Sequence, residues 1–191
     1  RAIWQETELA YRIVASTDHP AVAGSRSEAL KKTSAPMVKA MNSLGIKVAV
    51  SPKEKHRSGS PRTAANPCFT SHGKWEVGTQ DGRKLVGSAQ ARSRGVFLEH
   101  GSILFGNDQL KILDYLPRNT AESLKNILRK HLTEGIACIH EFDPNIEISD
   151  MENALHDSFS SIAGNPLESI SYEKLETERL GELECECGND I

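Results

Sequence analysis

Cysteines, aromatic residues and long apolar runs are all scarce in this chain of 191 residues. Its four cysteines are few and irregularly spaced for a disulfide-stapled secreted domain, so we expect a reducing, cytoplasmic compartment. No apolar run approaches the roughly 20 residues that a membrane helix needs, and the polar start does not resemble a signal peptide. These scarcities favour a soluble globular protein with one sizeable core and no membrane partner.

Acidic residues are scarce in the first half of the chain, and basic residues are scarce in the second half. Residues 1–100 contain 16 Lys and Arg but 8 Asp and Glu, whereas residues 101–191 contain 7 and 18. The basic first half suggests an acidic partner or a phosphate-bearing ligand, although two solvated faces of unlike sign would give the same counts. Aromatic residues make up 5% of the chain and do not interleave with a dense basic stripe. Nucleic acid is therefore not an expected partner.

The sequence offers little support for a metal site. Cys185 and Cys187 form a C-x-C pair in the acidic tail, but no second pair of metal-binding residues matches them. Half a metal site is one interpretation, and an unstructured tail is the one we favour. No metal is expected.

Apolar spacing predicts an α+β fold in which a mixed or antiparallel sheet is flanked by helices. Runs with period two indicate strands, and runs with period 3.6 indicate helices. A polar stretch rich in Pro, Ser and basic residues, at 51–66, is predicted to be a long mobile loop. The predicted strands cover residues 8–16, 46–50, 75–79, 84–92 and 96–105, and the predicted helices cover residues 25–44, 109–116, 120–132, 149–162 and 171–180.

The helix ends have their own signals. Pro36 predicts a kink or a late start in the first helix, and Gly45 predicts its end. Thr120 is the predicted N-cap of a later helix. Ser149, followed three residues later by Glu152, predicts a capping box at the start of the last long helix.

Two of the predicted strands should form a β-hairpin. Residues 93–95 predict a three-residue loop with its glycine in the left-handed conformation. That loop sets Arg92 opposite Val96 and Ser88 opposite His100. Because so many polar groups would share a face, this face is predicted to line a cavity or to be solvated. The polar residues placed on it are Lys84, Ser88, Gln90, His100 and Ser102.

The hairpin resembles a known family. The segment GRKLVGSAQARSRGVFLEHGSILF, residues 82–105, resembles the central hairpin of the biotin/lipoate protein ligase superfamily, with its lysine, Gly-Ser-Ala-Gln, turn and His-Gly-Ser. The opening RAIWQETELAYRIVAS resembles the segment that closes the family's glycine-rich acyl-binding motif. The resemblance implies a partial, N-terminally truncated catalytic core over residues 1–117. Residues 118–191 would be the C-terminal helical part of the same domain, with its acidic tail.

A cysteine loop narrows the resemblance. NPCFTSHGKWEV, residues 66–77, is similar to the loop of cysteine-dependent lipoyl and octanoyl transferases within this superfamily. By itself a lone cysteine is more often inert packing, but the resemblance implies that Cys68 is a catalytic nucleophile. Lys84 would lower the pKa of its thiol and stabilise the oxyanion. His72 is only a weak candidate for the base.

The resemblance also implies an acyl-binding site. One departure is that Gln5 and Glu6 stand where the family has His-Asp, so Gln5 cannot titrate in place of that histidine. The upstream half of the acyl-binding motif is not in this chain, so a further segment or a separate chain would have to complete the site. The implied substrate-binding residues are Arg1, Ala2, Gly87, Ser88, Ala89, Gln90, His100, Gly101 and Ser102.

Three functions stay open. The first is transfer of an octanoyl or lipoyl group, from acyl carrier protein or from a modified lipoyl domain, to a lysine of an acceptor such as glycine cleavage H protein or a dehydrogenase E2. This reaction would need no cofactor. The second is an ATP- and Mg-dependent lipoate–protein ligase that forms an acyl-adenylate. The third is a non-catalytic family member that acts as an assembly partner. Basic residues of the long loop would help an acidic carrier to dock, or would simply be solvated.

Overall fold

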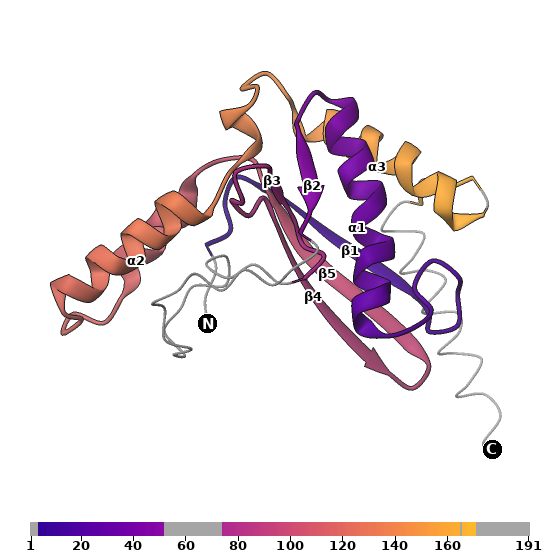
Figure 1. Ribbon diagram of the computed structural model, residues 1–191, viewed down its shortest axis with the longest axis horizontal. Coiled ribbons are helices and arrows are strands. Elements are labelled where there is room, and N and C mark those ends of the chain that lie inside the picture. Colours follow the sequence, from indigo (N-terminus) through magenta and orange to yellow (C-terminus); the bar gives the residue numbers. More distant parts are fainter. Residues whose placement is uncertain (1–3, 52–73, 165, 171–191) are drawn as a thin grey trace, which may run out of the picture.

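The structure is a computed structural model that describes residues 4–51, 74–164 and 166–170. Figure 1 shows a twisted sheet with α1 (Arg26–Ser43) and α3 (Ile148–Ala163) on one side of it and α2 (Glu122–Gly135) extending from the opposite end. This arrangement of helices around antiparallel strands confirms the predicted α+β class. None of the described helices is long and apolar enough to cross a membrane.

Five strands form two antiparallel sheets in the described part of the chain. The larger sheet has the order β1–β5–β4, and β2 pairs with β3 in the smaller sheet. Lys84, just before β4, bridges to Gly78 and to Ile136 and so ties the two sheets to the C-terminal part of the chain. The strands are β1 (Glu8–Ser16), β2 (Val48–Val50), β3 (Val77–Thr79), β4 (Val86–Ser93) and β5 (Val96–Leu104).

The first helix, α1 (Arg26–Ser43), agrees closely with its prediction. Ser25 is the N-cap, and its hydroxyl accepts a hydrogen bond from the backbone N–H of Glu28, whose carboxylate accepts one from Ser25 N–H. This reciprocal pair satisfies two of the N–H groups that a helix start leaves unpaired. The helix begins at Arg26 and continues through Pro36, so the predicted late start is wrong. It ends just before Gly45, as predicted.

The later helices differ from their predictions at their starts. α2 (Glu122–Gly135) begins after Ala121 and has no side-chain cap, so the prediction of Thr120 as N-cap is wrong. α3 (Ile148–Ala163) is capped by Glu147 with Asp150, two residues before the predicted Ser149 pair. The predicted short helix near residue 110 is the 3-10 helix η2 (Asp108–Tyr115), and a second, η3, covers Ile139–Glu141.

The hairpin between β4 and β5 corrects the predicted register by one residue. Ser93 pairs with Val96, so the loop contains only Arg94 and Gly95, both with positive φ (48° and 79°). Two consecutive residues at positive φ are typical of a two-residue type I′ turn, which matches the twist of the strands. The prediction was wrong because only the glycine signals positive φ in the sequence, whereas Arg94 adopts it as well.

A shift of one residue moves every side chain of a strand to the other face. Ser88 and Gln90 therefore lie on one face of the β1–β5–β4 sheet, and His100 and Ser102 lie on the opposite face. The prediction that these four residues share a face is wrong. We call the two sets the inner and the outer face. The inner face consists of Leu9, Tyr11, Ile13, Ala15, Val86, Ser88, Gln90, Arg92, Phe97, Glu99, Gly101 and Ile103.

Helices α1 and α3 cover the inner face. The main core lies between them and the sheet and contains Met37, Met41, Ile103 and Met151 among its fully buried side chains. Among the described residues, the cover of the outer face lies near the end of β5, where Leu104 packs in a second cluster with residues of η2 and α2. The rest of the outer face, including Ala10, Arg12, Ala89 and His100, is exposed.

Candidate functional site

Several residues of the predicted site lie outside the described part of the chain. Cys68, Arg1 and Ala2 are among them, as are His72 and the Cys185–Cys187 pair. Their predicted roles remain predictions.

Residues 52–73, which include Cys68 and are called the cysteine segment below, lie outside the described part of the chain. The described residues on either side of this segment are hydrogen-bonded to each other. Trp75 N–H donates to the carbonyl oxygen of Ser51 at 2.7 Å, and Ser51 N–H donates to Glu76 at 3.0 Å. Cys68 stands six residues before Lys74 in the sequence.

Lys84 is an almost fully buried cation. Its Nζ lies 2.8 Å from Oε2 of Glu76, and the exposed fractions of the two side chains are 5% and 11%. Backbone hydrogen bonds fix its position, because Lys84 N–H donates to Gly135 O and Lys84 O accepts from Ala137 N–H. A buried ammonium requires such a partner to offset the loss of hydration. Glu76 therefore holds the positive charge of Lys84 inside the protein.

A row of hydroxyl and carboxyl groups crosses the inner face near Lys84. The Tyr11 hydroxyl lies 2.6 Å from Ser88 Oγ and donates to Oε1 of Glu99 at 3.3 Å. Gln90 Nε2 and Thr33 Oγ1 donate to the other carboxyl oxygen of Glu99, at 2.7 and 2.9 Å. Three strands and α1 thus contribute to one connected network, which we call the Glu99 network (Tyr11, Thr33, Ser88, Gln90 and Glu99).

Gly101 makes this network possible. A Cβ atom added to Gly101 would lie 2.7 Å from the Tyr11 hydroxyl and 2.1 Å from the carbonyl oxygen of Gly87. Such distances are far inside van der Waals contact. The side chain of Tyr11 therefore passes over β5 at the one position without a side chain and reaches Ser88 on β4.

Burial changes the ionisation of the network. Glu99 has no exposed surface, and the loss of hydration raises its pKa, while the hydrogen bonds from Gln90, Thr33 and Tyr11 act in the opposite direction. The same loss of hydration raises the pKa of Tyr11, and the negative charge of Glu99 adds to the effect. Burial thus raises the pKa of both groups.

Ser88 and Gln90 line a polar cavity at the start of α1. The cavity has a volume of about 590 Å³, and its remaining lining residues are Arg26, Ser27, Leu30 and Lys74. Gln90 Oε1 is buried and has no hydrogen-bond partner among the described residues. The cavity therefore combines two hydrogen-bonding side chains from the predicted site with two basic residues.

Trp75 stands next to this cavity in a conformation unusual for its type. Its φ is 70°, in the left-handed region that side chains rarely adopt. Its indole N–H donates to Ser27 Oγ at 2.8 Å, and the ammonium groups of Lys31 and Lys74 lie 5.0 and 5.1 Å from the ring centroid. These contacts hold the start of β3 against α1 at the point where the cysteine segment ends.

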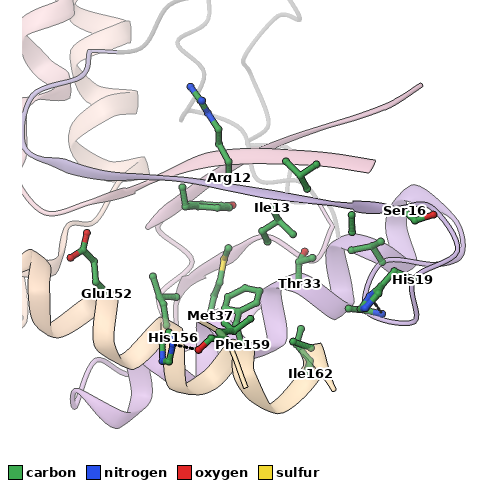
Figure 2. Close-up of a pocket in the computed structure, with 18 of the residues that line it drawn as sticks. Arg12, Ile13, Ser16, His19, Thr33, Met37, Glu152, His156, Phe159 and Ile162 are labelled. Atoms are coloured by element: carbon green, nitrogen blue, oxygen red, sulfur yellow. Dashed lines mark hydrogen bonds between the residues drawn. The ribbon is translucent and has the colours of Figure 1, made fainter. Parts of the chain in front are cut away.

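A larger, mostly apolar cavity of about 660 Å³ lies at the edge of β1 (Figure 2). In the figure, Met37, Phe159 and Ile162 point into it from α1 and α3, whereas Arg12 points away on the other side of the strand. Tyr11 and Thr33 also line this cavity. The Glu99 network thus has members in both cavities.

The outer face carries the rest of the predicted binding residues. Gly87, Ala89, His100 and Ser102 lie there, and Ser102 Oγ donates to Oε1 of Glu8 at 3.0 Å. Burial raises the pKa of Glu8, which is half-buried. His100 is exposed and stands on the opposite side of the sheet from Ser88.

Reasoning from sequence missed Glu99, Tyr11 and Thr33 as members of a polar network. The sequence contained one signal for Glu99. It lies in the same period-two positions of its strand as the apolar residues Phe97 and Ile103, so its side chain should point to the same buried face. A carboxyl group in the buried phase of a strand calls for hydrogen-bond partners. The partners themselves could not be found, because they depend on the pairing of β1 with β5.

The other described nucleophiles and ligands form no second site. Cys138 is buried, and burial together with the charge of Glu141 raises the pKa of its thiol, so it is a poor nucleophile. Among the residues that the structure describes, no group of three or more His, Cys, Asp or Glu side chains is arranged to hold a metal ion.

Comparisons with known proteins agree with this fold and with the motif on β4. Residues 2–160 match the lipoyl protein ligase A/B catalytic domain family. Proteins named octanoyltransferase LipM are similar: that of Staphylococcus aureus is 31% identical over 95% of this chain and 67% of its own length. That of Kyrpidia tusciae is 31% identical over 93% and 65%. The chain thus spans about two thirds of the length of these relatives.

Solved structures show the same fold at lower identity. A bipartite lipoate protein ligase of Thermoplasma acidophilum, described together with its E2 lipoyl domain, matches with a TM-score of 0.60 and 19% identity over 91% of this chain and 58% of its own. A lipoate-protein ligase A bound with ATP matches with a TM-score of 0.57 and 18% identity, over 91% and 60%. The fold and the motifs thus define a domain of the lipoate ligase type. The chain belongs to the lipoyl protein ligase A/B catalytic domain family.

Proposed function

We propose that this protein transfers octanoyl groups in protein lipoylation through a thioester on Cys68. The observation that carries the proposal is the similarity to proteins named octanoyltransferase LipM along 95% of the chain. Buried Lys84 is consistent with it, because a fixed cation in a nearly dry environment is suited to stabilising negative charge in a transition state.

The proposed reaction has two balanced steps. The Cys68 thiolate attacks the carbonyl carbon of an octanoyl thioester, and the carrier thiolate leaves and takes up a proton. The ε-amino group of an acceptor lysine then attacks the thioester on Cys68, loses a proton, and releases the Cys68 thiol. Lys84 would stabilise the tetrahedral oxyanion, and its charge would favour the thiolate of Cys68. The first step exchanges one thioester for another, so it is nearly neutral in free energy.

The polar cavity of Ser88 and Gln90 is our candidate for the binding site of the acyl carbonyl. It combines residues of the GSAQ motif with Lys74, where the described chain resumes after the cysteine segment. The remaining residues of the predicted site stay candidates: Arg1, Ala2, Gly87, Ala89, Gly101, and also His100 and Ser102 of the outer face.

The acceptors in this proposal are lipoyl domains, and the donor is octanoyl-acyl carrier protein or an already modified lipoyl domain. In this reading the reaction needs no cofactor. The N-terminal part of the chain, with residues 1–117, would supply the catalytic core.

The test is an assay of octanoyl transfer to a lipoyl-domain lysine, run without ATP and with each donor in turn. Wild type should modify the acceptor, and Cys68→Ser should lose the activity by at least about 100-fold, the scale expected when a covalent nucleophile is removed. Cys138→Ser is the matched control, because Cys138 is buried within the α2 cluster and should not react. Full activity of Cys68→Ser would contradict the proposal.

An ATP-dependent lipoate ligase is the second candidate. The structural similarity to a lipoate-protein ligase A bound with ATP favours it. In that case Cys68→Ser would retain activity, and product would form only from free lipoate or octanoate with ATP and Mg²⁺. Omitting ATP from the assay therefore separates the two candidates. Turnover by either route would exclude a purely non-catalytic assembly partner.

A further inference from the structure

The Glu99 network contains a chain of three hydrogen-bonded groups: the carboxyl group of Glu99 and the hydroxyl groups of Tyr11 and Ser88. The Tyr11 hydroxyl from β1 contacts Oε1 of Glu99 on β5 and Oγ of Ser88 on β4. Glu99 is at the buried end, with no exposed surface, and Ser88 is at the cavity end. The chain therefore connects a buried carboxyl group to the wall of a binding cavity.

The contact lengths favour one direction for the hydrogen atoms. Tyr11 has a single hydroxyl hydrogen, and its oxygen is 2.6 Å from Ser88 Oγ but 3.3 Å from Glu99 Oε1. The shorter contact has the usual length of an O–H···O hydrogen bond, whereas the longer one is weak. When Tyr11 donates to Ser88, the hydrogen of Ser88 is left for a group in the cavity.

The charge of Glu99 decides whether this direction holds. Its partners on α1 and β4, Thr33 and Gln90, are neutral, and no Lys or Arg contacts it among the described residues. On the inner face Arg92 donates to the carbonyl oxygens of Gly24 and Val22, and Lys84 pairs with Glu76, whose charge acts on Tyr11. A fully buried carboxyl without a cation favours its neutral form.

We propose that Glu99 is a positioning residue that, while neutral, lets Ser88 donate a hydrogen bond to the carbonyl oxygen of the bound acyl group. When Glu99 loses its proton, the Tyr11 hydroxyl donates to the carboxylate, Ser88 donates to Tyr11, and Ser88 Oγ then presents only lone pairs to the cavity. An acyl carbonyl can only accept, so the ionised protein binds it less well. This inference rests on the proposed function, which supplies the acyl ligand.

The test compares the pH dependence of kcat/KM in wild type and Glu99→Gln, whose amide cannot ionise. The measured quantity is the ratio of wild type to variant between about pH 5 and about pH 9, a range that covers the ionisation of buried glutamates. We expect this ratio to fall about tenfold or more as the pH rises, the size expected for one lost hydrogen bond. In a Tyr11→Phe background the ratio should stay constant, because the connection to Ser88 is missing.

Glu8→Gln is the matched control. Glu8 is also a carboxyl that accepts from a serine, and burial also raises its pKa, but it lies on the outer face. The ratio of wild type to Glu8→Gln should not change with pH. A constant ratio for Glu99→Gln, or an equal fall for both variants, would overturn the inference.

An infrared titration separates this inference from the proposed function. The carboxylic acid band that is present in wild type and absent in Glu99→Gln should persist at neutral pH, and Tyr11→Phe should shift its frequency. Both changes can be measured without any transfer activity. If wild type transfers no octanoyl group while the band behaves as expected, the proposed function fails and the hydrogen-bond chain stands. If the band is absent at neutral pH, the chain fails whatever the activity.

Discussion

The two faces of the β1–β5–β4 sheet carry polar groups of similar type in very different settings. Each face has a carboxyl group that accepts from a hydroxyl: Glu99 with Thr33 on the inner face, and Glu8 with Ser102 on the outer face. The inner group is enclosed by α1, whereas the outer group is half-buried beside an exposed stretch of sheet. The same chemistry thus forms a connected network on one side and a separate hydroxyl–carboxyl pair on the other, in which Ser102 is buried.

The difference shows how covering a sheet with helices changes what its polar side chains must do. Covering the inner face removes water, so each polar group there must find a protein partner or a ligand. Ser88 and Gln90 do so beside a cavity, and Lys84 does so with Glu76. On the outer face Ser102 and Glu8 pair in the same way, whereas His100 and Ala89 are exposed. We therefore place the proposed chemistry on the inner face.

Lys84→Met should give the largest effect. It leaves Glu76 buried without its ion-pair partner, which should lower the free energy of unfolding by about 3 kcal/mol and reduce octanoyl transfer by about 100-fold or more. Adding Glu76→Gln should restore much of the stability but none of the activity. Urea denaturation and the transfer assay measure the two effects. Recovery of activity in the double variant would show that Lys84 acts only as structural support.

Gly101→Ala should have the next largest effect, which is a loss of stability. The new methyl group would collide with the Gly87 carbonyl and with Tyr11, so we expect a loss of about 3 kcal/mol. Gly95→Ala is the control at the hairpin turn, where nothing lies within 4 Å but φ is positive. It should cost about 1 kcal/mol. Equal losses in denaturation would mean that Tyr11 does not pass closely over Gly101.

The pH dependence of stability should differ between the two carboxyl groups in size but not in sign. Folding raises the pKa of both Glu99 and Glu8, so the folded state holds a proton that the unfolded state has lost. Stability should therefore fall as the pH rises above about 4.3, where a free glutamate ionises, until the folded group ionises too. Glu99→Gln should remove more of this fall than Glu8→Gln, because Glu99 is fully buried. Urea denaturation across this pH range measures the fall in the free energy of unfolding. A larger effect of Glu8→Gln than of Glu99→Gln would contradict this prediction.

His100→Ala should give the smallest effect. His100 is exposed on the outer face, so its removal should change the free energy of unfolding by less than about 0.5 kcal/mol. If the inner face performs the chemistry, transfer activity should fall much less than in Ser88→Ala. A larger loss of activity for His100→Ala would move the site to the outer face.

Much of the fold followed from the sequence. The period-two pattern located β1, and the apolar spacing together with the Gly45 signal located α1, because short-range propensities decide these features. The caps of α2 and α3 were misplaced by one or two residues, since several residues near each start are able to cap a helix. The end of the chain, with its predicted last helix, lies outside the described residues.

The site was harder to predict than the fold for a specific reason. The prediction that Ser88 and His100 share a face failed on the conformation of one residue, Arg94, whose positive φ shortens the hairpin loop. Because strands alternate, that single error moved half of the expected site to the other side of the sheet. Lys84 and Ser88 were found by resemblance, but Tyr11 and Thr33 came from contacts that are distant in sequence, which no local pattern encodes.

The most direct test of the account is a pulse–chase measurement of the acyl-enzyme by intact and peptide mass spectrometry. The protein is mixed with octanoyl-acyl carrier protein or an octanoylated lipoyl domain, and an unmodified lipoyl domain is added afterwards. The account predicts one octanoyl group on the peptide that contains Cys68, absent in Cys68→Ser, which moves to the acceptor lysine during the chase. An octanoylated acceptor without any acyl group passing through Cys68 would contradict it.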